Sequence, residues 1–489
     1  MATAAPARAL LPYGFARVQG VIVADGECLH RAATPLTALL EAQRLAGAAL
    51  AWRKLPDAEF EKALQALYRD QAGDSADIAA EATDLHALAD SVAATEDLLD
   101  TSDDSPVIRL INALLLEAVK EHASDIHVET QERRLIVRFR VDGVLRDVVE
   151  PNRALAPLLT SRIKVMARLD IAEKRVPQDG RVTIRVGGHE IDIRVSTIPT
   201  QHGERVVMRL LDRGSVELDM ATLGMSPRDL TLFEKLLDRP HGMLLVTGPT
   251  GSGKTTSLYA ALTRLNDRKR NIMTVEDPIE YELAGIAQTQ VNPRTDMSFA
   301  RGLRAILRQD PDVIMVGEIR DQETAEVAVR SAMTGHFMLS TLHTNSAVGS
   351  VTRLVDMGVE RYLLAPMLVG LVAQRLVRRL CSACRREDVA GARDAALLDG
   401  AIAEGETVWR AVGCPACRGE GFRGRMGIYE IVAVDGAFEA LIHDGAPEAA
   451  LVAAARAAGP SLLDDGIAKV RAGETTVEEV ARVTRDEGV

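Results

Sequence analysis

One segment constrains the fold of this chain more than any other, because it contains three consecutive elements of a phosphate-binding unit. The short apolar run Met243–Thr247 predicts a buried strand. It leads into the glycine-rich loop Gly248–Thr255, which reads Gly-Pro-Thr-Gly-Ser-Gly-Lys-Thr, and then into the helical pattern Thr256–Leu262. These three elements in this order predict an α/β domain that binds a nucleoside triphosphate.

The loop supplies the chemical groups that a triphosphate requires. Its glycines let backbone N–H groups surround phosphate oxygens at the N-terminus of the helix. Lys254 can reach the β- and γ-phosphates, and the hydroxyl of Thr255 can ligate Mg²⁺. The residues expected to contact the nucleotide are Gly248, Pro249, Thr250, Gly251, Ser252, Gly253, Lys254, Thr255 and Thr256.

Two further apolar runs carry carboxylates that could serve hydrolysis. The run Asp312–Glu318 predicts a second buried strand, and Glu318 at its end could orient the attacking water or accept its proton. Asp312 opens this run instead of closing it, so the metal-carboxylate position is not filled in the commonest way. After another strand-like run, Glu276 and Asp277 could hold Mg²⁺ through water. A solvated acidic turn is the alternative for this pair.

Two histidines flank a further short strand pattern. His336 and His343 lie at opposite ends of the apolar run between them. A lone histidine is more often structural, but two that flank a strand in a nucleotide-binding domain suggest a sensor of the γ-phosphate. We take His343 as the catalytic candidate.

Four of the five cysteines form two CxxC pairs. Cys381 and Cys384 make the first pair, and Cys414 and Cys417 make the second. This pattern predicts a structural zinc site with four thiolate ligands, because a closed shell leaves no position for a reactive water. A redox role is the alternative, although neither pair has a thioredoxin-like context. Cys28 is expected to be a small buried apolar residue.

Composition shifts predict three domains. An N-terminal domain at 1–100 ends in an acidic linker, since residues 70–104 contain eleven acidic side chains and no Lys or Arg. An α+β domain follows at 105–212, where strand-like and helix-like patterns alternate. The nucleotide-binding domain spans 225–489 and contains the cysteine insertion 381–417.

The overall composition excludes several classes of protein. With 47% hydrophobic and 26% charged residues, the chain has enough apolar surface for several cores. No run of 18 apolar residues predicts a membrane span, and the N-terminus lacks the pattern of a signal peptide, so we expect a cytosolic protein. The formal charge of −12 argues against a strongly basic nucleic-acid-binding surface.

The motif series as a whole resembles the secretion ATPases of type II secretion and type IV pili. Four blocks occur in that family's order, as its Walker A loop, aspartate box, Walker B block and histidine box, at Gly248–Thr255, Val275–Tyr281, Asp310–Asp321 and Gly335–Thr344. Upstream, three segments resemble the family's second N-terminal domain, at Ala123–Glu129, Arg162–Arg181 and Gly203–Leu211. The resemblance implies a RecA-like P-loop ATPase core that follows a PAS-like α+β domain and a small N-terminal domain.

The resemblance also implies roles for four arginines. Arg194 and Arg209 match family arginines that reach phosphate from the second N-terminal domain. Arg304 and Arg308 match arginines near the active site, and their spacing would place them on one face of a helix. Arginine suits this role because its rigid donors carry a permanent charge.

Two other features narrow the choice within that family. A tetracysteine insertion occurs in its type II secretion and pilus-assembly motors and is absent from its retraction motors. The short N-terminal region with Leu11–Gly20 resembles the first domain of the type II secretion ATPase, which grips the cytoplasmic part of an inner-membrane partner. The implied protein is a cytoplasmic homo-hexamer, peripheral at the inner membrane, that uses ATP, Mg²⁺ and structural Zn²⁺ to drive pseudopilus assembly and protein export. The alternatives are a type IV pilus assembly ATPase, a RecA-like motor that translocates nucleic acid, and a scaffold that binds ATP without hydrolysing it. No nucleic-acid partner is expected.

Overall fold

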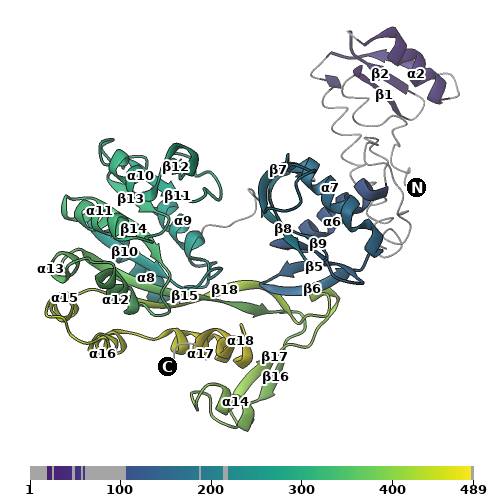
Figure 1. The fold of residues 1–489 in the computed structure, drawn as a ribbon. Coiled ribbons are helices and arrows are strands. Elements are labelled where there is room, and N and C mark those ends of the chain that lie inside the picture. The colour runs from purple at the N-terminus through teal and green to yellow at the C-terminus, as the bar shows by residue number, and fades with distance from the viewer. Residues whose placement is uncertain are drawn as a thin grey trace. The chain divides into compact units, whose positions relative to one another are not determined.

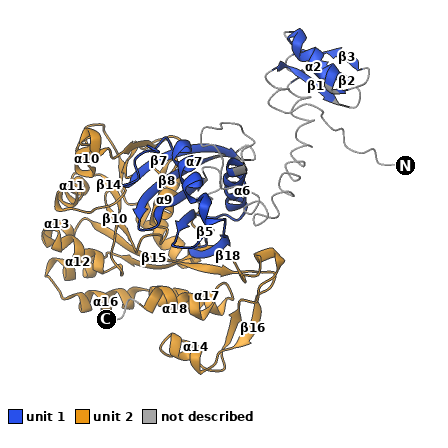
Figure 2. Ribbon diagram, turned by 45° about the vertical axis from the view of Figure 1, so that its right-hand side comes forward, with its two compact units in different colours: residues 1–212 blue, residues 213–489 orange. Residues whose placement is uncertain are grey.

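The chain divides into two compact units, residues 1–212 and 213–489 (Figure 2). The computed structural model describes residues 19–24, 27–32, 34–46, 50–56, 59–60, 106–186, 189–212 and 219–485. The predicted acidic linker lies outside the described residues, as does Leu11–Gly20 up to residue 18. Among the described residues, no helix is both long and apolar enough to cross a membrane.

The N-terminal module is a small three-stranded sheet with one helix. Its elements are β1 (Val21–Ala24), β2 (Glu27–His30), α2 (Leu36–Ala46) and β3 (Ala51–Lys54), and the strand order is β1-β2-β3. Apolar residues of β1 and α2 pack around Cys28, which is fully buried. Burial raises the pKa of the Cys28 thiol to about 11. This cysteine is therefore the buried apolar residue that was predicted.

The second part of this unit is an α+β fold. Its elements are α6 (Pro106–Lys120), β4 (Asp125–Thr130), β5 (Leu135–Val141), β6 (Val144–Val149), α7 (Ala156–Met166), β7 (Gln178–Val186), β8 (His189–Thr200) and β9 (Gly203–Asp212). The strands form an antiparallel sheet of order β6-β5-β4-β9-β8-β7. Apolar residues of α6 and α7 pack with alternate strand residues into one core.

Unit 213–489 is built on a seven-stranded sheet of order β12-β11-β13-β14-β10-β15-β18. Its strands are β10 (Gly242–Thr247), β11 (Ile272–Glu276), β12 (Ala287–Gln290), β13 (Val313–Val316), β14 (Phe337–Leu342), β15 (Leu368–Leu380) and β18 (Phe422–Ala433). The first six run parallel, and β18 pairs antiparallel with β15. The α/β class predicted from the phosphate loop is confirmed.

Both faces of this sheet are covered, as buried parallel strands require. In β10, Met243 and Leu245 belong to one core, whereas Leu244 and Val246 belong to the other. The second core receives α8 (Pro227–Leu237) and α9 (Lys254–Leu265). The first receives α10 (Phe299–Ile306), α11 (Gln322–Met333), α12 (Gly349–Asp356), α13 (Arg361–Leu364), α15 (Gly436–His443), α16 (Glu448–Ala458), α17 (Leu462–Arg471) and α18 (Val477–Thr484). Figure 1 shows α17 and α18 running along the long strands β15 and β18.

The cysteine insertion lies between β15 and β18. It contains β16 (Arg386–Val389), α14 (Ala392–Leu397) and β17 (Thr407–Arg410), and the two strands pair antiparallel. Arg410 links the insertion to the C-terminal helices, since it forms ion pairs with Asp394 at 2.6 Å and with Glu478 at 3.2 Å. The insertion is thus held against helices that cover the seven-stranded sheet.

Candidate functional site

Most of the predicted chemistry gathers at the carboxyl edge of the parallel sheet. The strand order β11-β13-β14-β10 places four strand ends side by side. The phosphate loop follows β10, Glu276 ends β11, Glu318 follows β13, and His343 follows β14. Ligands of open α/β sheets bind at this edge, because the loops there converge and helix N-termini point toward it.

The phosphate loop begins with a backbone conformation that requires glycine. Gly248 has φ of 149°, and a Cβ atom added to it would lie 2.5 Å from the carbonyl oxygen of Gln374. Lys254 Nζ donates to the carbonyl oxygens of Gly248 at 2.7 Å and Pro249 at 3.1 Å. Ser252 Oγ is buried and has no hydrogen-bond partner among the described residues. This curled backbone, with a lysine and an orphaned hydroxyl inside it, fits a phosphate group.

The electrostatics of the loop also favour an anion. Burial lowers the pKa of Lys254 to about 8, and the nearby positive charge of Arg375 acts in the same direction. Glu318 opposes this change. The ammonium is therefore insufficiently neutralised by protein groups, and a triphosphate would supply the missing negative charge.

Glu318 and His343 form a hydrogen-bonded pair beside the loop. His343 Nε2 lies 3.1 Å from Glu318 Oε2, and Arg320 forms an ion pair with the other carboxylate oxygen. Arg320 also lies 3.9 Å from Asp277. The side chain of Glu318 is 13% exposed, so it keeps limited access to water. A carboxylate in this position can orient a water molecule or accept its proton.

Glu276 has a more enclosed environment than its predicted role requires. Its carboxylate accepts hydrogen bonds from the Tyr259 hydroxyl, from Thr274 Oγ1 at 2.5 Å and from Gln288 Nε2 at 3.0 Å. The residue is only 2% exposed. These bonds attach β11 to α9 and β12. The predicted contact of Glu276 with Mg²⁺ through water stays a prediction.

Two residues of the motif blocks lie at the opposite edge of the sheet. His336 precedes β14, and its Nδ1 lies 2.9 Å from the carbonyl oxygen of Ser331 at the end of α11. A six-residue strand spans roughly 20 Å, which separates His336 from His343. Asp312 precedes β13 and accepts a hydrogen bond from the Asn271 N–H group at 2.6 Å. Of the two histidines, His343 is the one that lies with the phosphate loop.

The four predicted arginines are divided between the two units, with one pair in each. Arg304 is on α10 and pairs with Glu323, whereas Arg308 lies beyond the end of the helix and donates to the Arg304 carbonyl at 2.8 Å. In the other unit, Arg194 of β8 lies opposite Arg209 of β9. Arg209 Nε donates to Asp125 Oδ1 at 2.9 Å. The proposed contacts of all four arginines with phosphate stay predictions.

Sequence reasoning missed two residues of β15 that touch the phosphate loop. Gln374 Oε1 accepts a hydrogen bond from Ser257 Oγ of α9 at 2.8 Å, and Arg375 is buried beside Gly248. The signal was present, because a buried strand pattern of apolar residues from Leu368 onward is interrupted by these two polar side chains. Arg320 was also missed, although it lies two residues after Glu318.

The four predicted cysteines form a compact cluster. Their sulfur atoms all lie within 4.8 Å of one another. The Sγ–Sγ distances are 3.9 Å for Cys381 and Cys414, 3.7 Å for Cys384 and Cys417, and 3.7 Å for Cys414 and Cys417. Four thiolates around zinc at about 2.3 Å lie about 3.8 Å apart, so the cluster suits a tetrahedral metal site.

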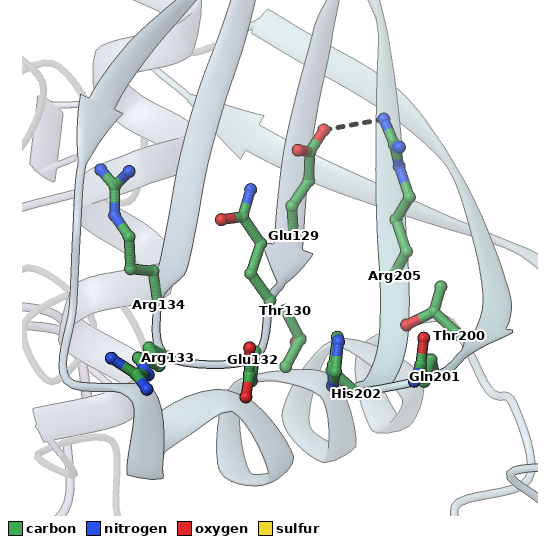
Figure 3. Close-up of a pocket in the computed structure, with 10 residues that line it drawn as sticks. Glu129, Thr130, Glu132, Arg133, Arg134, Thr200, Gln201, His202 and Arg205 are labelled. Carbon is green, nitrogen blue, oxygen red and sulfur yellow. Dashed lines mark ion pairs between the residues drawn. The ribbon is translucent and has the colours of Figure 1, made fainter.

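A hollow lies in unit 1–212, at the turns of its antiparallel sheet (Figure 3). Its volume is about 600 Å³, and none of the predicted site residues lines it. Arg205 points toward Glu129 across it, and their charged groups lie 2.7 Å apart. Arg134 is likewise paired with Glu150 at 2.6 Å. The charged side chains that line the hollow are thus partly neutralised by ion pairs within the protein.

Comparison with known proteins identifies the family. The family model described as "Type II/IV secretion system protein" matches residues 100–482, and a second model, which describes an N-terminal domain of "GSPII protein E", matches residues 10–68. The chain belongs to the type II/IV secretion system protein family. The type II secretion system protein E of Pseudomonas aeruginosa is 58% identical, over 99% of this chain and 98% of that protein. The type II secretion system ATPase E of Vibrio cholerae is 53% identical, over 97% of each chain.

Solved structures of a pilus motor and of another ATPase have the same fold. The pilus retraction motor PilT with bound ADP has a TM-score of 0.52 and 26% identity, over 76% of this chain and 95% of that chain. The ATPase DotB of Legionella pneumophila has a TM-score of 0.58 and 21% identity, over 77% of this chain and 95% of that chain. The resemblance stated from the motif series is confirmed. This member of the type II/IV secretion family is an ATP hydrolase.

Proposed function

We propose that this chain is the ATPase of a type II secretion system, which hydrolyses ATP to drive pseudopilus assembly and export of folded proteins. The observation that carries the proposal is the meeting of the phosphate loop with the Glu318–His343 pair at one sheet edge. The full-length similarity to type II secretion proteins supports the choice of machine.

The residues of the site divide the work of hydrolysis. Lys254 would exchange its bonds to the carbonyls of Gly248 and Pro249 for phosphate oxygens when ATP enters. Glu318 would hold the attacking water, and His343 would keep the Glu318 carboxylate in place through their hydrogen bond. Thr255, at the exposed start of α9, would hold Mg²⁺, which neutralises charge on the phosphates when it is bound.

The cysteine cluster would hold one structural Zn²⁺. A closed set of four thiolates leaves no open coordination position, so the ion would stabilise the fold instead of taking part in hydrolysis. Backbone N–H groups of Cys414 and Gly421 donate to Cys417 Sγ at 3.1 and 3.2 Å. Although burial opposes them, these bonds and the neighbouring thiols of Cys384 and Cys414 lower the pKa of the Cys417 thiol to about 6, which favours its thiolate form, whereas burial raises the pKa of Cys384.

The assembly would be a homo-hexamer docked at the cytoplasmic side of the inner membrane through a platform protein. The match of residues 10–68 to an N-terminal domain of the protein E family supports a docking role for this part of the chain. The pilus-assembly ATPase remains the alternative within the family. Deleting the gene should stop secretion of extracellular enzymes and leave surface pili unchanged, whereas loss of pili alone would favour the alternative.

The hydrolysis proposal is tested with purified full-length protein. Glu318→Gln keeps the side-chain volume but removes the base, so the ATP turnover rate should fall at least about 100-fold. Arg379→Gln is the matched control, since Arg379 is an exposed residue of β15, and it should retain wild-type turnover. Turnover that survives Glu318→Gln would refute the assigned role, and turnover that requires added DNA would favour a nucleic-acid motor.

A further inference from the structure

Two neighbouring residues of β15 connect the phosphate loop to both faces of the sheet. Consecutive strand residues point to opposite faces. Gln374 reaches Ser257 of α9 on one face, with a bond of 2.8 Å. Arg375 lies on the other face, where its Nη1 would be 3.2 Å from a Cβ atom added to Gly248. The first residue of the phosphate loop therefore packs directly against this pair.

Arg375 also holds the segment that follows His343. Its Nη2 donates to the carbonyl oxygen of Asn345 at 2.7 Å. The same segment is held from β10, since the backbone N–H group of Thr344 donates to Thr247 Oγ1 at 3.0 Å. Thr247 ends the strand that leads into the phosphate loop. The segment that follows His343 is thus hydrogen-bonded both to the last residue of β10 and to the guanidinium of Arg375.

The guanidinium of Arg375 is buried, and burying a charge costs free energy. This cost argues that the charge serves a purpose at this position. Arg375 is only 5% exposed, and a buried charge requires compensation. Glu430 of β18 interacts with it electrostatically, and Arg456 lies 3.7 Å from the same carboxylate. Arg375 also adds positive charge beside Lys254. An arginine whose task was only to fill space would not need this arrangement.

We propose that Arg375 is a positioning residue for ATP hydrolysis, which fixes the segment carrying His343 relative to the phosphate loop. Arg375 would act through His343 and its partner Glu318, not by binding the nucleotide. Hydrolysis should therefore depend on Arg375 more strongly than nucleotide binding does. This inference rests on the proposed roles of Glu318 and His343.

The test is a double-mutant cycle in the full-length chain. Arg375→Gln should lower kcat about tenfold, while the Kd for a fluorescent non-hydrolysable ATP analogue changes less than about threefold. His343→Ala should lower kcat by a similar factor. Because the two residues act on the same event, the double variant should be little slower than the slower single variant. A purely structural arginine would give effects on kcat that multiply.

Two further variants protect the test against misfolding. Arg375→Gln leaves Glu430 without one neighbouring cation, so Arg375→Gln is also made together with Glu430→Gln and compared with Glu430→Gln alone. The same drop in kcat is expected in that background. Arg379→Gln, four residues along β15 and exposed, should leave kcat and Kd at wild-type values. Thermal melting verifies that each variant folds.

The outcomes separate this inference from the proposed function. An unchanged kcat in Arg375→Gln, a multiplicative effect with His343→Ala, or a loss of nucleotide affinity as large as the loss of kcat would each overturn the positioning role. These results would leave the role of Glu318 intact. Conversely, wild-type protein that does not hydrolyse ATP, or Glu318→Gln protein that does, would overturn the proposed function itself.

Discussion

Nucleotide binding should draw a proton into the phosphate loop at alkaline pH. In the nucleotide-free protein, burial lowers the pKa of Lys254 to about 8 from the ordinary value of 10.5. A triphosphate brings negative charge to the ammonium and favours its charged form. A full return to the ordinary value would correspond to about 3 kcal/mol of charge stabilisation by the phosphates. Lys254 should therefore take up a proton when nucleotide binds.

The size of the uptake follows from the two pKa values. With a pKa of about 8 before binding, and with the ordinary lysine value of 10.5 taken for the bound state, uptake should be about one tenth of a proton per nucleotide at pH 7. It should rise to about one half at pH 8 and about nine tenths at pH 9. Isothermal titration calorimetry measures this proton uptake. The protein is titrated with a non-hydrolysable ATP analogue in the presence of Mg²⁺, in buffers of different ionisation enthalpy. Imidazole groups of ordinary pKa are largely neutral in this range.

The variant Glu318→Gln tests whether Lys254 is the group that takes up the proton. Glu318 raises the pKa of Lys254, so Glu318→Gln should lower that pKa further and increase the uptake at pH 8 toward one proton. Uptake near zero from pH 7 to 9 would refute the reasoning. So would an uptake at pH 8 that Glu318→Gln leaves unchanged.

Two other perturbations test the cysteine cluster and the buried carboxylate. Metal analysis should find about one zinc per chain. Replacing Cys381 and Cys414 with serine should abolish zinc binding and lower the melting temperature, because the ion would join the two ends of the insertion. A metal-free chain that melts like the wild type would contradict this. Tyr259→Phe should destabilise the protein by about 1–3 kcal/mol in chemical denaturation, because Glu276 would lose a buried donor. An unchanged denaturation midpoint would show that Glu276 does not depend on this bond.

Some site residues were predictable because their function is local. The eight residues of the phosphate loop contain both the glycines that permit its backbone conformation and the lysine that fills it. Each CxxC pair spans four residues and can supply two thiolates to one metal ion, so the spacing alone predicted a metal site. The end of an apolar run similarly indicated that Glu318 emerges at a strand end.

Other features of the site depend on which strands are neighbours in the sheet. The alternation of apolar and polar residues along one strand does not show which strands lie beside it. The Glu318–His343 pair joins residues 25 apart, and the Ser257–Gln374 bond joins residues 117 apart. The pattern that made Glu276 a candidate ligand did not show that Tyr259 and Gln288 would enclose it.

The sequence by itself therefore determined that this chain binds a triphosphate, where the loop begins, and which cysteines could share a metal. The tertiary structure decided that His343 lies with the loop whereas His336 does not, and that Arg375 is buried beside Gly248. The physical reason is that crossover connections in a parallel sheet bring distant strand ends together. Burial, and hence the electrostatic consequence of each charge, exists only after those strands have packed.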